Sequence, residues 1–386
     1  MWLEEAGTKL HKGIDPVAKW LCNIGMYFVV VMVVGVIADI IMRLLSVSVP
    51  GLFEAQILMM VMVTFFSVAY VGVVKGHIAI DILLKKFPLR VQAALNAAND
   101  ILAIVLLVIL AWQGALYAMT NLNQYTAILR IPNAMIMFLV TAGCGLLAIV
   151  ILADLLQHLG EVIKAHWWPG LVLTILLPLI IYTAPVWMDW VGVSTIMSGV
   201  ISLLTMLVLI FLGLPLAFAL GLGGFVGVGY TASWPAVLAL AGSVPYNAVA
   251  DYFLCVIPFF VLMGSLAAIS GISRDLFHTI RVWLGRLPGS LAMATVAGGA
   301  AFGAVCGDSF ATAAIMGKVA LPEMKKGKYA DSLAGASVAV GGTMGIMIPP
   351  SVIFIIYAIL TEQSVGALFM AGIFPGVLEV AFYMVV

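Results

Sequence analysis

The sequence predicts an all-α protein that crosses a membrane many times, and three observations lead to this fold class. Of the 386 residues, 64% are hydrophobic and only 9% are charged, whereas soluble domains carry about 25% charged residues. The apolar residues stand in long runs, and about 20 such residues span a bilayer as a helix. The alternating pattern of a membrane β-barrel is missing, so we expect helices throughout.

Charge and composition exclude several classes of function. The 17 Lys and Arg balance the 17 Asp and Glu, so no global field attracts a nucleic acid. The four cysteines lie apart, and no Cys or His cluster has the spacing of a zinc site. The five histidines also lie away from one another, which disfavours a polytopic membrane enzyme, because such an enzyme needs clustered catalytic side chains.

The N-terminal part, residues 1–165, is expected to be a four-helix membrane part. Its apolar runs are about 20–42, 55–74, 100–119 and 134–153. Lys and Arg gather in alternate polar segments, and these cations mark the cytoplasmic side of a membrane. The N-terminus carries Lys9, Lys12 and Lys19, so we expect it in the cytoplasm, with four spans returning the chain there.

The chain after residue 165 has a different character. Residues 166–194 are expected to form one linking transmembrane helix, opened by the pair Trp167-Trp168, which is typical of a membrane interface. Residues 195–386 hold glycine-rich apolar runs, and small residues allow helices in a membrane to approach closely. Within this part, basic and apolar residues alternate over 273–289, which predicts an amphipathic helix on the cytoplasmic surface.

Residues 289–321 are predicted to form a re-entrant hairpin, which enters the membrane and returns to the same side. Each half is too short for a full span, and cations flank both ends, at Arg286 and at Lys325 and Lys326. The turn falls at Cys306-Gly307-Asp308-Ser309. Irregular backbone in a membrane is tolerated only where it lines a cavity or is buried in protein, so this tip can offer carbonyls and helix ends to an ion or a substrate.

The apolar run from about 330 to 360 is predicted to be a helix broken near its middle. Gly341, Gly342 and Gly345 precede the pair Pro349-Pro350, and proline removes a backbone donor and disrupts a helix interior. Freed carbonyls there are hard oxygen ligands that suit sodium. A kinked helix with packing glycines is the alternative, but two breaks so close together favour a site shared by the hairpin tip and the broken helix.

On these motifs the sequence resembles the membrane component of a TRAP (tripartite ATP-independent periplasmic) transporter with its small Q-type and large M-type subunits fused. The M-type resemblance rests on Cys306-Gly307-Asp308-Ser309-Phe-Ala-Thr312, on Gly345-Ile-Met-Ile-Pro349-Pro350-Ser351 and on Ala371-Gly372-Ile-Phe-Pro375-Gly376. The looser Q-type resemblance rests on Glu54 and on Lys75-Gly-His77-Ile-Ala-Ile-Asp81. Together they cover about 15–165 and 195–386.

The resemblance implies a sodium-coupled secondary transporter that imports a small organic acid by an elevator mechanism, with no cofactor besides the coupling ion Na⁺. A periplasmic solute-binding protein would deliver the substrate. Two alternatives remain: another ion-coupled elevator carrier that works without a binding protein, and a non-catalytic membrane scaffold. The Q-like half disfavours the first alternative, and the hairpin tip and the Pro-Pro break disfavour the second.

The resemblance also implies a sodium site built mainly from backbone carbonyls. The matching positions are Gly303, Cys306, Gly345, Ile348 and Pro350. The polar residues along the substrate path or around this site would be Asp308, Ser309, Thr312, Thr343 and Ser351. Because an acid facing an anionic substrate would repel it, we expect Asp308 to be hydrogen-bonded structure or to support the field around the ion.

An M-type subunit is built from two inverted repeats, each with its own hairpin, and this bears on the C-terminus. The chain ends within the apolar run 377–386, so we expect a C-terminal truncation. The second hairpin and a second sodium site would lie beyond Val386, and the chain as written is not expected to transport by itself.

In the Q-like part, the spacing of His77 and Asp81 predicts a pair on one face of an interfacial helix. Its expected role is to orient the cytoplasmic loop, with a proton relay as the alternative. Glu54 stands at a helix start, where its carboxylate suits the positive end of the helix dipole.

Overall fold

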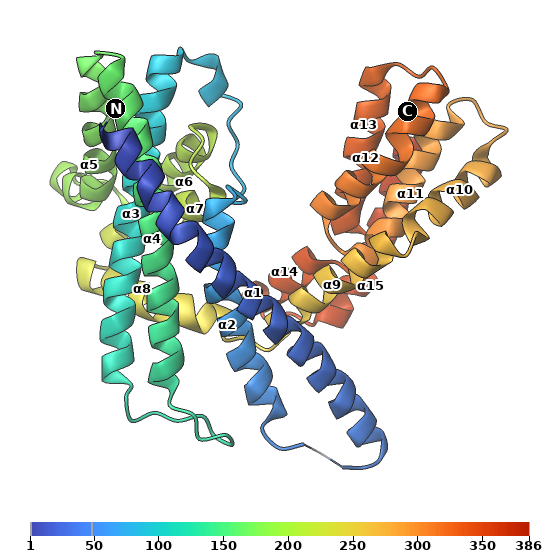
Figure 1. The fold of residues 1–386 in the computed structure, drawn as a ribbon, viewed down its shortest axis with the longest axis horizontal. Coiled ribbons are helices and arrows are strands. Elements are labelled where there is room, and N and C mark those ends of the chain that lie inside the picture. The colour runs from blue at the N-terminus through green and yellow to red at the C-terminus, as the bar shows by residue number, and fades with distance from the viewer. Residues whose placement is uncertain (1, 48, 386) are drawn as a thin grey trace. The chain divides into compact units, whose positions relative to one another are not determined.

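The computed structural model describes residues 2–47 and 49–385, and within these ranges the chain is helical, with 15 α-helices and no strand (Figure 1). The all-α prediction is therefore confirmed. The chain divides into two compact units, Met1–Asp251 and Tyr252–Val386. Each unit is described separately.

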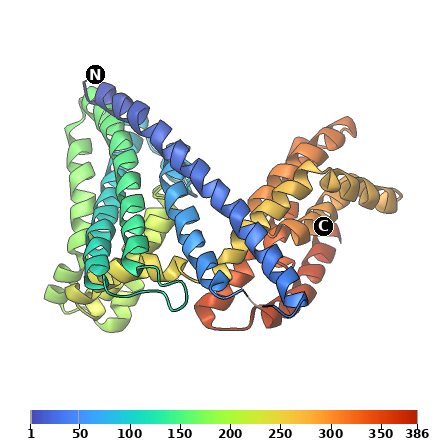
Figure 2. The same cartoon turned by 60° about the horizontal axis from the view of Figure 1, so that its bottom comes forward.

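The first unit is a helical bundle. Figure 2 shows its helices α3 and α4 side by side, with α1 crossing them. Its elements are α1 (Trp2–Leu44), α2 (Leu52–Val73), the 3₁₀ turn η1 (Leu84–Lys86), α3 (Leu89–Thr120), α4 (Asn133–Lys164), α5 (Trp168–Val191), α6 (Thr195–Phe211), α7 (Leu216–Thr231) and α8 (Trp234–Val249).

The core of the first unit lies between α2, α3, α4 and the helices α5 to α7. Buried residues such as Leu102, Ile136, Met188 and Leu222 form one hydrophobic cluster there. The apolar side chains that remain exposed, such as Val108 and Trp112 of α3, fit a surface that meets lipid rather than water. The Q-like helices and the first helices of the M-like part therefore share one core.

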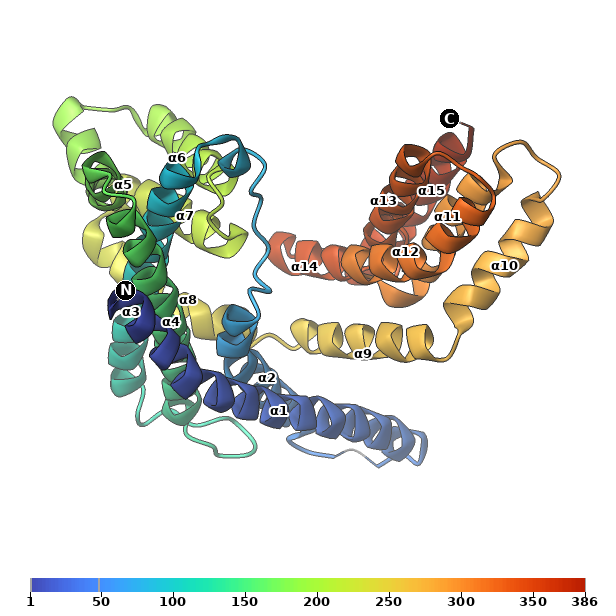
Figure 3. The same ribbon diagram turned by 45° about the horizontal axis from the view of Figure 1, so that its top comes forward.

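The second unit contains the hairpin and the broken helix, and Figure 3 shows α11, α12 and α13 packed together. Its elements are η2 (Phe253–Cys255), α9 (Val256–Ile269), α10 (Ile272–Leu284), α11 (Ser290–Cys306), α12 (Ser309–Lys326), α13 (Asp331–Met347), α14 (Val352–Thr361) and α15 (Val365–Val385). The predicted amphipathic segment forms α10, and the predicted hairpin forms α11 and α12. Its second helix continues to Lys326, beyond the expected end at residue 321, because Pro322 is accommodated inside α12.

Six helices of the described ranges, α1 to α5 and α15, are long and apolar enough to cross a membrane. Helices α13 and α14 pass the same test only as a pair, and they are bent by 42° at the break between them. The predicted interruption of the run 330–360 is therefore confirmed. Residues 289–326 form two helices of 17 and 18 residues, each shorter than the roughly 20 residues that span a bilayer.

Candidate functional site: the hairpin tip and the broken helix

The hairpin tip is a tight turn between two helix ends. Helix α11 stops at Gly307, whose φ of 67° lies in the left-handed region that favours glycine, and its N–H donates to the Gly303 carbonyl at 2.7 Å. Asp308 is extended and caps α12, because its carboxylate accepts from the Ala311 N–H at 2.9 Å. The Thr312 hydroxyl donates to the Asp308 carbonyl at 2.6 Å. Asp308 is thus engaged in local structure, as expected.

The break between α13 and α14 is a short extended segment. Helix α13 ends at Met347, and Ile348 and Ser351 both have extended backbone angles. Proline has no N–H and disrupts a helix interior, which explains why the helix stops before Pro349. The Ser351 side chain is fully buried, and its Oγ has no hydrogen-bond partner among the described residues.

The hairpin tip and the break lie in direct backbone contact. The Val352 N–H donates to the Gly307 carbonyl at 3.2 Å, which joins the start of α14 to the end of α11. A Cβ atom on Gly303 would lie 2.5 Å from the Gly345 Cα, and one on Gly307 would lie 3.0 Å from the Pro350 carbonyl oxygen. Only glycine permits these approaches, so the prediction that the tip and the break meet is confirmed.

Helix α12 closes the same junction from another side. A Cβ atom on Gly345 would lie 2.8 Å from both the Asp308 carbonyl oxygen and the Thr312 Oγ1. Helix α15 lies over the break, because Gly376 faces Ile348 and Gly372 faces Pro349. The motif around Pro375 therefore has a structural role, since its glycines let α15 approach the broken segment.

Four helix ends meet at this junction, and they carry opposite partial charges. The carbonyl ends of α11 and α13 are partly negative, whereas the amide ends of α12 and α14 are partly positive. In membrane carriers, such half-helix ends hold coupling ions and anionic substrate groups. The arrangement can therefore attract a cation and an anion to neighbouring positions.

Three of the predicted site residues, Thr343, Cys306 and Ser309, differ in their exposure and surroundings. Thr343 is exposed, and its hydroxyl donates to the Val340 carbonyl of its own helix at 2.7 Å. The structure therefore does not bring the Thr343 side chain to the break, because it is exposed on a different face of α13 from Gly345. Cys306 is buried, with its Sγ against Gly264 of α9, while Ser309 is half-buried at the first turn of α12.

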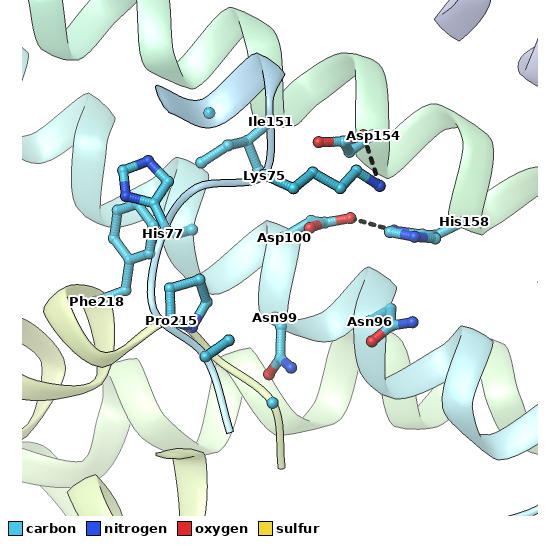
Figure 4. Close-up of a pocket in the computed structure, with 14 residues that line it drawn as sticks. Lys75, His77, Asn96, Asn99, Asp100, Ile151, Asp154, His158, Pro215 and Phe218 are labelled. Carbon is cyan, nitrogen blue, oxygen red and sulfur yellow. Dashed lines mark hydrogen bonds and ion pairs between the residues drawn. The ribbon is translucent and has the colours of Figure 1, made fainter. Parts of the chain in front are cut away.

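A second feature, the polar cavity of the first unit, was not predicted from the sequence (Figure 4). It has a volume of about 210 Å³ and is lined by the segment 75–79, by α3 and α4, and by the turn before α7. His158 Nδ1 lies 2.6 Å from Asp100 Oδ2, and Lys75 Nζ lies 3.7 Å from Asp154 Oδ1. The spacing of Asp154 and His158, four residues apart at the end of an apolar run, was the signal available for finding it.

The predicted pair of His77 and Asp81 is wrong. Helix α2 ends at Val73 and Lys75 has a φ of 51°, so residues 74–83 are not helical and helical spacing does not apply. Asp81 instead lies 2.6 Å from Lys85 Nζ, and the His77 ring packs edge-on against Phe218, with 5.9 Å between ring centroids.

The segment that contains His77 holds the turn between α6 and α7. The Leu216 N–H donates to the Ile78 carbonyl at 2.8 Å, and the Asn99 side-chain amide donates to the Leu212 carbonyl at 3.0 Å. We refer to residues 75–81 and 212–216, with Asn99, as the clasp. The clasp joins the Q-like helices to the first helices of the M-like part.

Metal binding by side chains has no support in the residues that the structure describes, because no group of three His, Cys, Asp or Glu could hold an ion there. A site built from backbone carbonyls, as the sequence predicts for the tip and the break, is of a different kind.

Comparison with known proteins links both parts of the chain to one transport system. Residues 32–161 match the family model described as "Tripartite ATP-independent periplasmic transporters, DctQ component". Residues 203–386 match the model described as "Tripartite ATP-independent periplasmic transporter, DctM component". The two matches follow one another in one polypeptide.

Curated relatives carry related names. The chain is 28% identical over 306 residues to the isethionate TRAP transporter permease protein DctMQ of Oleidesulfovibrio alaskensis, covering 79% of this chain and 46% of that relative. It is 40% identical over 135 residues to the C4-dicarboxylate TRAP transporter large permease protein DctM of Pseudomonas aeruginosa, covering 35% of this chain and 32% of that relative. The chain thus spans less than half the length of these relatives, which are named as permeases and not as enzymes.

Proposed function

The chain belongs to the membrane components of TRAP transporters, with a DctQ part and a DctM part in one polypeptide, and from this we propose that it serves the import of an organic acid. The names of its relatives give isethionate, C4-dicarboxylates and sialic acid as the solutes of those proteins. These solutes share a negatively charged acid group. A small organic anion is therefore the substrate class we propose for this chain.

Sodium is the coupling ion that we propose, and the junction of tip and break carries this proposal. The carbonyls of Gly303, Cys306, Gly345, Ile348 and Pro350 belong to the two partly negative helix ends or to the broken segment between helices. The buried Ser351 hydroxyl supports a ligand at this place, because a buried polar group without a partner costs about 1–3 kcal/mol. A sodium ion would accept a lone pair from the Ser351 oxygen.

The substrate anion would lie at the amide ends of α12 and α14. Backbone N–H groups at a helix start attract carboxylates and similar anions. Ser309, at the start of α12, offers a hydroxyl beside this position. The Asp308 carboxylate already accepts hydrogen bonds from N–H groups of its own helix. These hydrogen bonds make it less available as a ligand for sodium.

We further propose that the second unit moves against a scaffold formed by the first, as an elevator. Two observations support a moving unit and a scaffold: the chain forms two compact units, and backbone contacts hold the helices of the second unit together. The partner would be a periplasmic solute-binding protein, and the membrane would be the bacterial inner membrane. The alternation of cations in the polar segments supports a cytoplasmic N-terminus.

Sodium binding by this chain is the direct test. The purified chain is titrated with NaCl against choline chloride at constant ionic strength, and its thermal unfolding is followed in nanodiscs. Sodium at 100 times its Kd should add about 2.7 kcal/mol of stability. Ser351→Ala should shift the sodium midpoint upward, whereas Thr343→Ala, on the exposed face of the same broken helix, should leave it unchanged. Equal melting temperatures in sodium and choline would contradict the sodium site.

Coupling needs a separate measurement. Uptake of labelled organic acids by the whole transporter with its binding protein should require an inward sodium gradient. Uptake that ignores sodium would overturn the coupling, even if the chain binds the ion. Replacing Pro349 and Pro350 by Ala should let the helix continue and remove both the sodium response and uptake.

A further inference from the structure

A large apolar cavity adjoins the polar cavity of the first unit. Its volume is about 530 Å³, and it lies among α2, α3, α7 and α8, with Phe65, Leu106, Leu110 and Val244 among its lining residues. Protein interiors have few voids larger than a water molecule. This space is open to the surface, where its lining residues Leu240 and Val244 are exposed, so in a membrane an apolar occupant such as an acyl chain would fill it.

The two cavities meet at shared side chains. His77 and Phe218 line both of them. Their rings pack edge-on against each other. The lining is apolar on one side of this ring pair and polar on the other. The two cavities thus adjoin at this ring pair, one apolar and one polar, and we refer to them together as the amphipathic space.

The polar end contains a buried acceptor that needs a donor. Asn99 is only 5% exposed, and although its amide donates to Leu212, its Oδ1 has no partner within the ranges that the structure describes. Asp100 and Asp154 line the same cavity, and Lys75 stands at its rim with a side chain 70% exposed. The polar end therefore holds an amide oxygen that no described residue pairs, a cation at the rim, and two carboxylates that already contact protein side chains, Asp100 with His158 and Asp154 with His11 and Lys75.

The depth of this polar end fits the lipid headgroup region. The apolar run of α3 begins directly after Asp100, and that of α4 ends directly before Asp154. The alternation of cations along the sequence assigns this end of both helices to the cytoplasmic boundary of the membrane. Headgroups lie at this level, and acyl chains lie on the apolar side of it.

We propose that the amphipathic space binds one phospholipid whose headgroup carries a primary ammonium, as phosphatidylethanolamine does. An acyl chain fills the apolar cavity. The ammonium donates to Asp100 and to the Asn99 Oδ1, while the phosphate faces Lys75. Because α2, α3, α7 and α8 all line the apolar cavity, the lipid joins the Q-like helices to the M-like helices beside the clasp.

Headgroup chemistry gives the first test. The full chain is placed in nanodiscs with equal amounts of phosphatidylethanolamine, phosphatidylcholine and phosphatidylglycerol, extracted, and analysed by native mass spectrometry. One phosphatidylethanolamine should be retained at roughly tenfold preference, because choline has no N–H donors and charge-assisted hydrogen bonds are the strong ones. Equal retention of the three lipids, or retention of none, would overturn the proposal.

Matched variants locate the retained lipid. Gly224 lines the apolar cavity, and a Cβ atom there meets nothing within 4 Å, so Gly224→Phe should fill the space and reduce retained lipid roughly tenfold. Gly145 also has nothing within 4 Å of its Cβ position but lines a separate apolar groove between α3 and α4. Gly145→Phe is therefore the control and should retain the lipid. Equal retention in both variants would contradict the assignment.

A milder variant keeps the test decisive if the aromatic substitution disturbs folding. Asp100→Asn keeps the shape of the side chain and removes the charge that would face the ammonium. It should abolish the preference for phosphatidylethanolamine over phosphatidylcholine, with circular dichroism unchanged. An unaltered preference in this variant would overturn the proposed headgroup contact.

Discussion

Two regions of the molecule join helices within a membrane: the junction of the hairpin tip with the broken helix, and the clasp around the polar cavity. They differ in the atoms that make the contacts. At the junction, Gly303, Gly307 and Gly345 bring backbone against backbone, and Pro350 presents a carbonyl. At the clasp, one backbone hydrogen bond, from the Leu216 N–H to the Ile78 carbonyl, is supplemented by side chains: Asn99 donates to Leu212, and His77 packs against the neighbouring Phe218. Backbone contacts need glycine or proline at fixed positions, whereas side-chain contacts can be assembled from distant segments.

The largest effect should come from placing one methyl group in the backbone junction. Gly303→Ala puts a Cβ 2.5 Å from the Gly345 Cα, so α11 and α13 must separate. Overpacking of this kind costs about 1–3 kcal/mol, and thermal unfolding of the chain in nanodiscs measures it.

The control for this variant lies on α13 itself. A Cβ atom on Gly335 meets nothing within 4 Å, and alanine in a helix is more stable than glycine by up to about 1 kcal/mol. Gly335→Ala should therefore leave the melting temperature unchanged or raise it. Equal destabilisation by both alanines would break the comparison, because it would show that the close contact is not what matters.

A double-mutant cycle tests the polar cavity. Asp100→Ala and His158→Ala each remove one partner of a half-buried pair, since His158 Nδ1 and Asp100 Oδ2 lie 2.6 Å apart. We expect a coupling free energy of about 1–2 kcal/mol from the two single variants and the double variant. Strictly additive losses would mean that the two side chains do not support one another.

The cap of α12 should have a smaller effect. Asp308→Ala removes the acceptor of the Ala311 N–H and should cost about 1 kcal/mol, whereas Asp308→Asn keeps a capping oxygen and should cost less. Chemical denaturation of the two variants measures the difference. Equal losses for Asn and Ala would contradict the role of the capping oxygen, because both variants lack the charge and only Asn keeps the oxygen.

The smallest expected effect is a pH dependence at His77. Burial lowers the pKa of His77, so the unfolded chain takes up a proton as pH falls through about 6.5 while the folded chain does not. This contribution to stability is present above that pH and is lost below it. Lys75, Asp100, Asp154 and His158 line the same cavity and remain in the variant His77→Phe. The variant should lose less stability between pH 7.5 and about 5.5 than the parent chain, and an identical pH profile would contradict the inference.

Much of the second unit was predictable because its motifs act through the backbone. The glycines before Pro349 predict a broken helix, and the sequence around Asp308 predicts a turn. Both breaks, their meeting and a hydrogen-bonded Asp308 were therefore predicted, although the cap that Asp308 makes for α12 was not. Thr343 was placed near the break, whereas it is exposed on a different face of α13 from Gly345.

The polar cavity was not predictable in the same way. Its members come from a non-helical segment, two long helices and the turn before α7, and the motif that begins at Lys75 does not show which side chains of the other segments it meets. The error over His77 has a related cause. The prediction assumed that the helix continued past Val73, whereas the left-handed Lys75 redirects the chain toward Phe218.

The glycine contacts between α11 and α13 also have an entropic consequence. Ordering a long side chain costs up to about 2 kcal/mol in lost rotamer freedom, but glycine has no rotamers to lose. Forming the contacts at Gly299, Gly303, Gly341 and Gly345 therefore freezes backbone alone. At these positions α11 and α13 touch through backbone atoms, with no flexible side chain between them. A displacement at the end of one helix is therefore transmitted to the other, because no side chain changes rotamer to accommodate it.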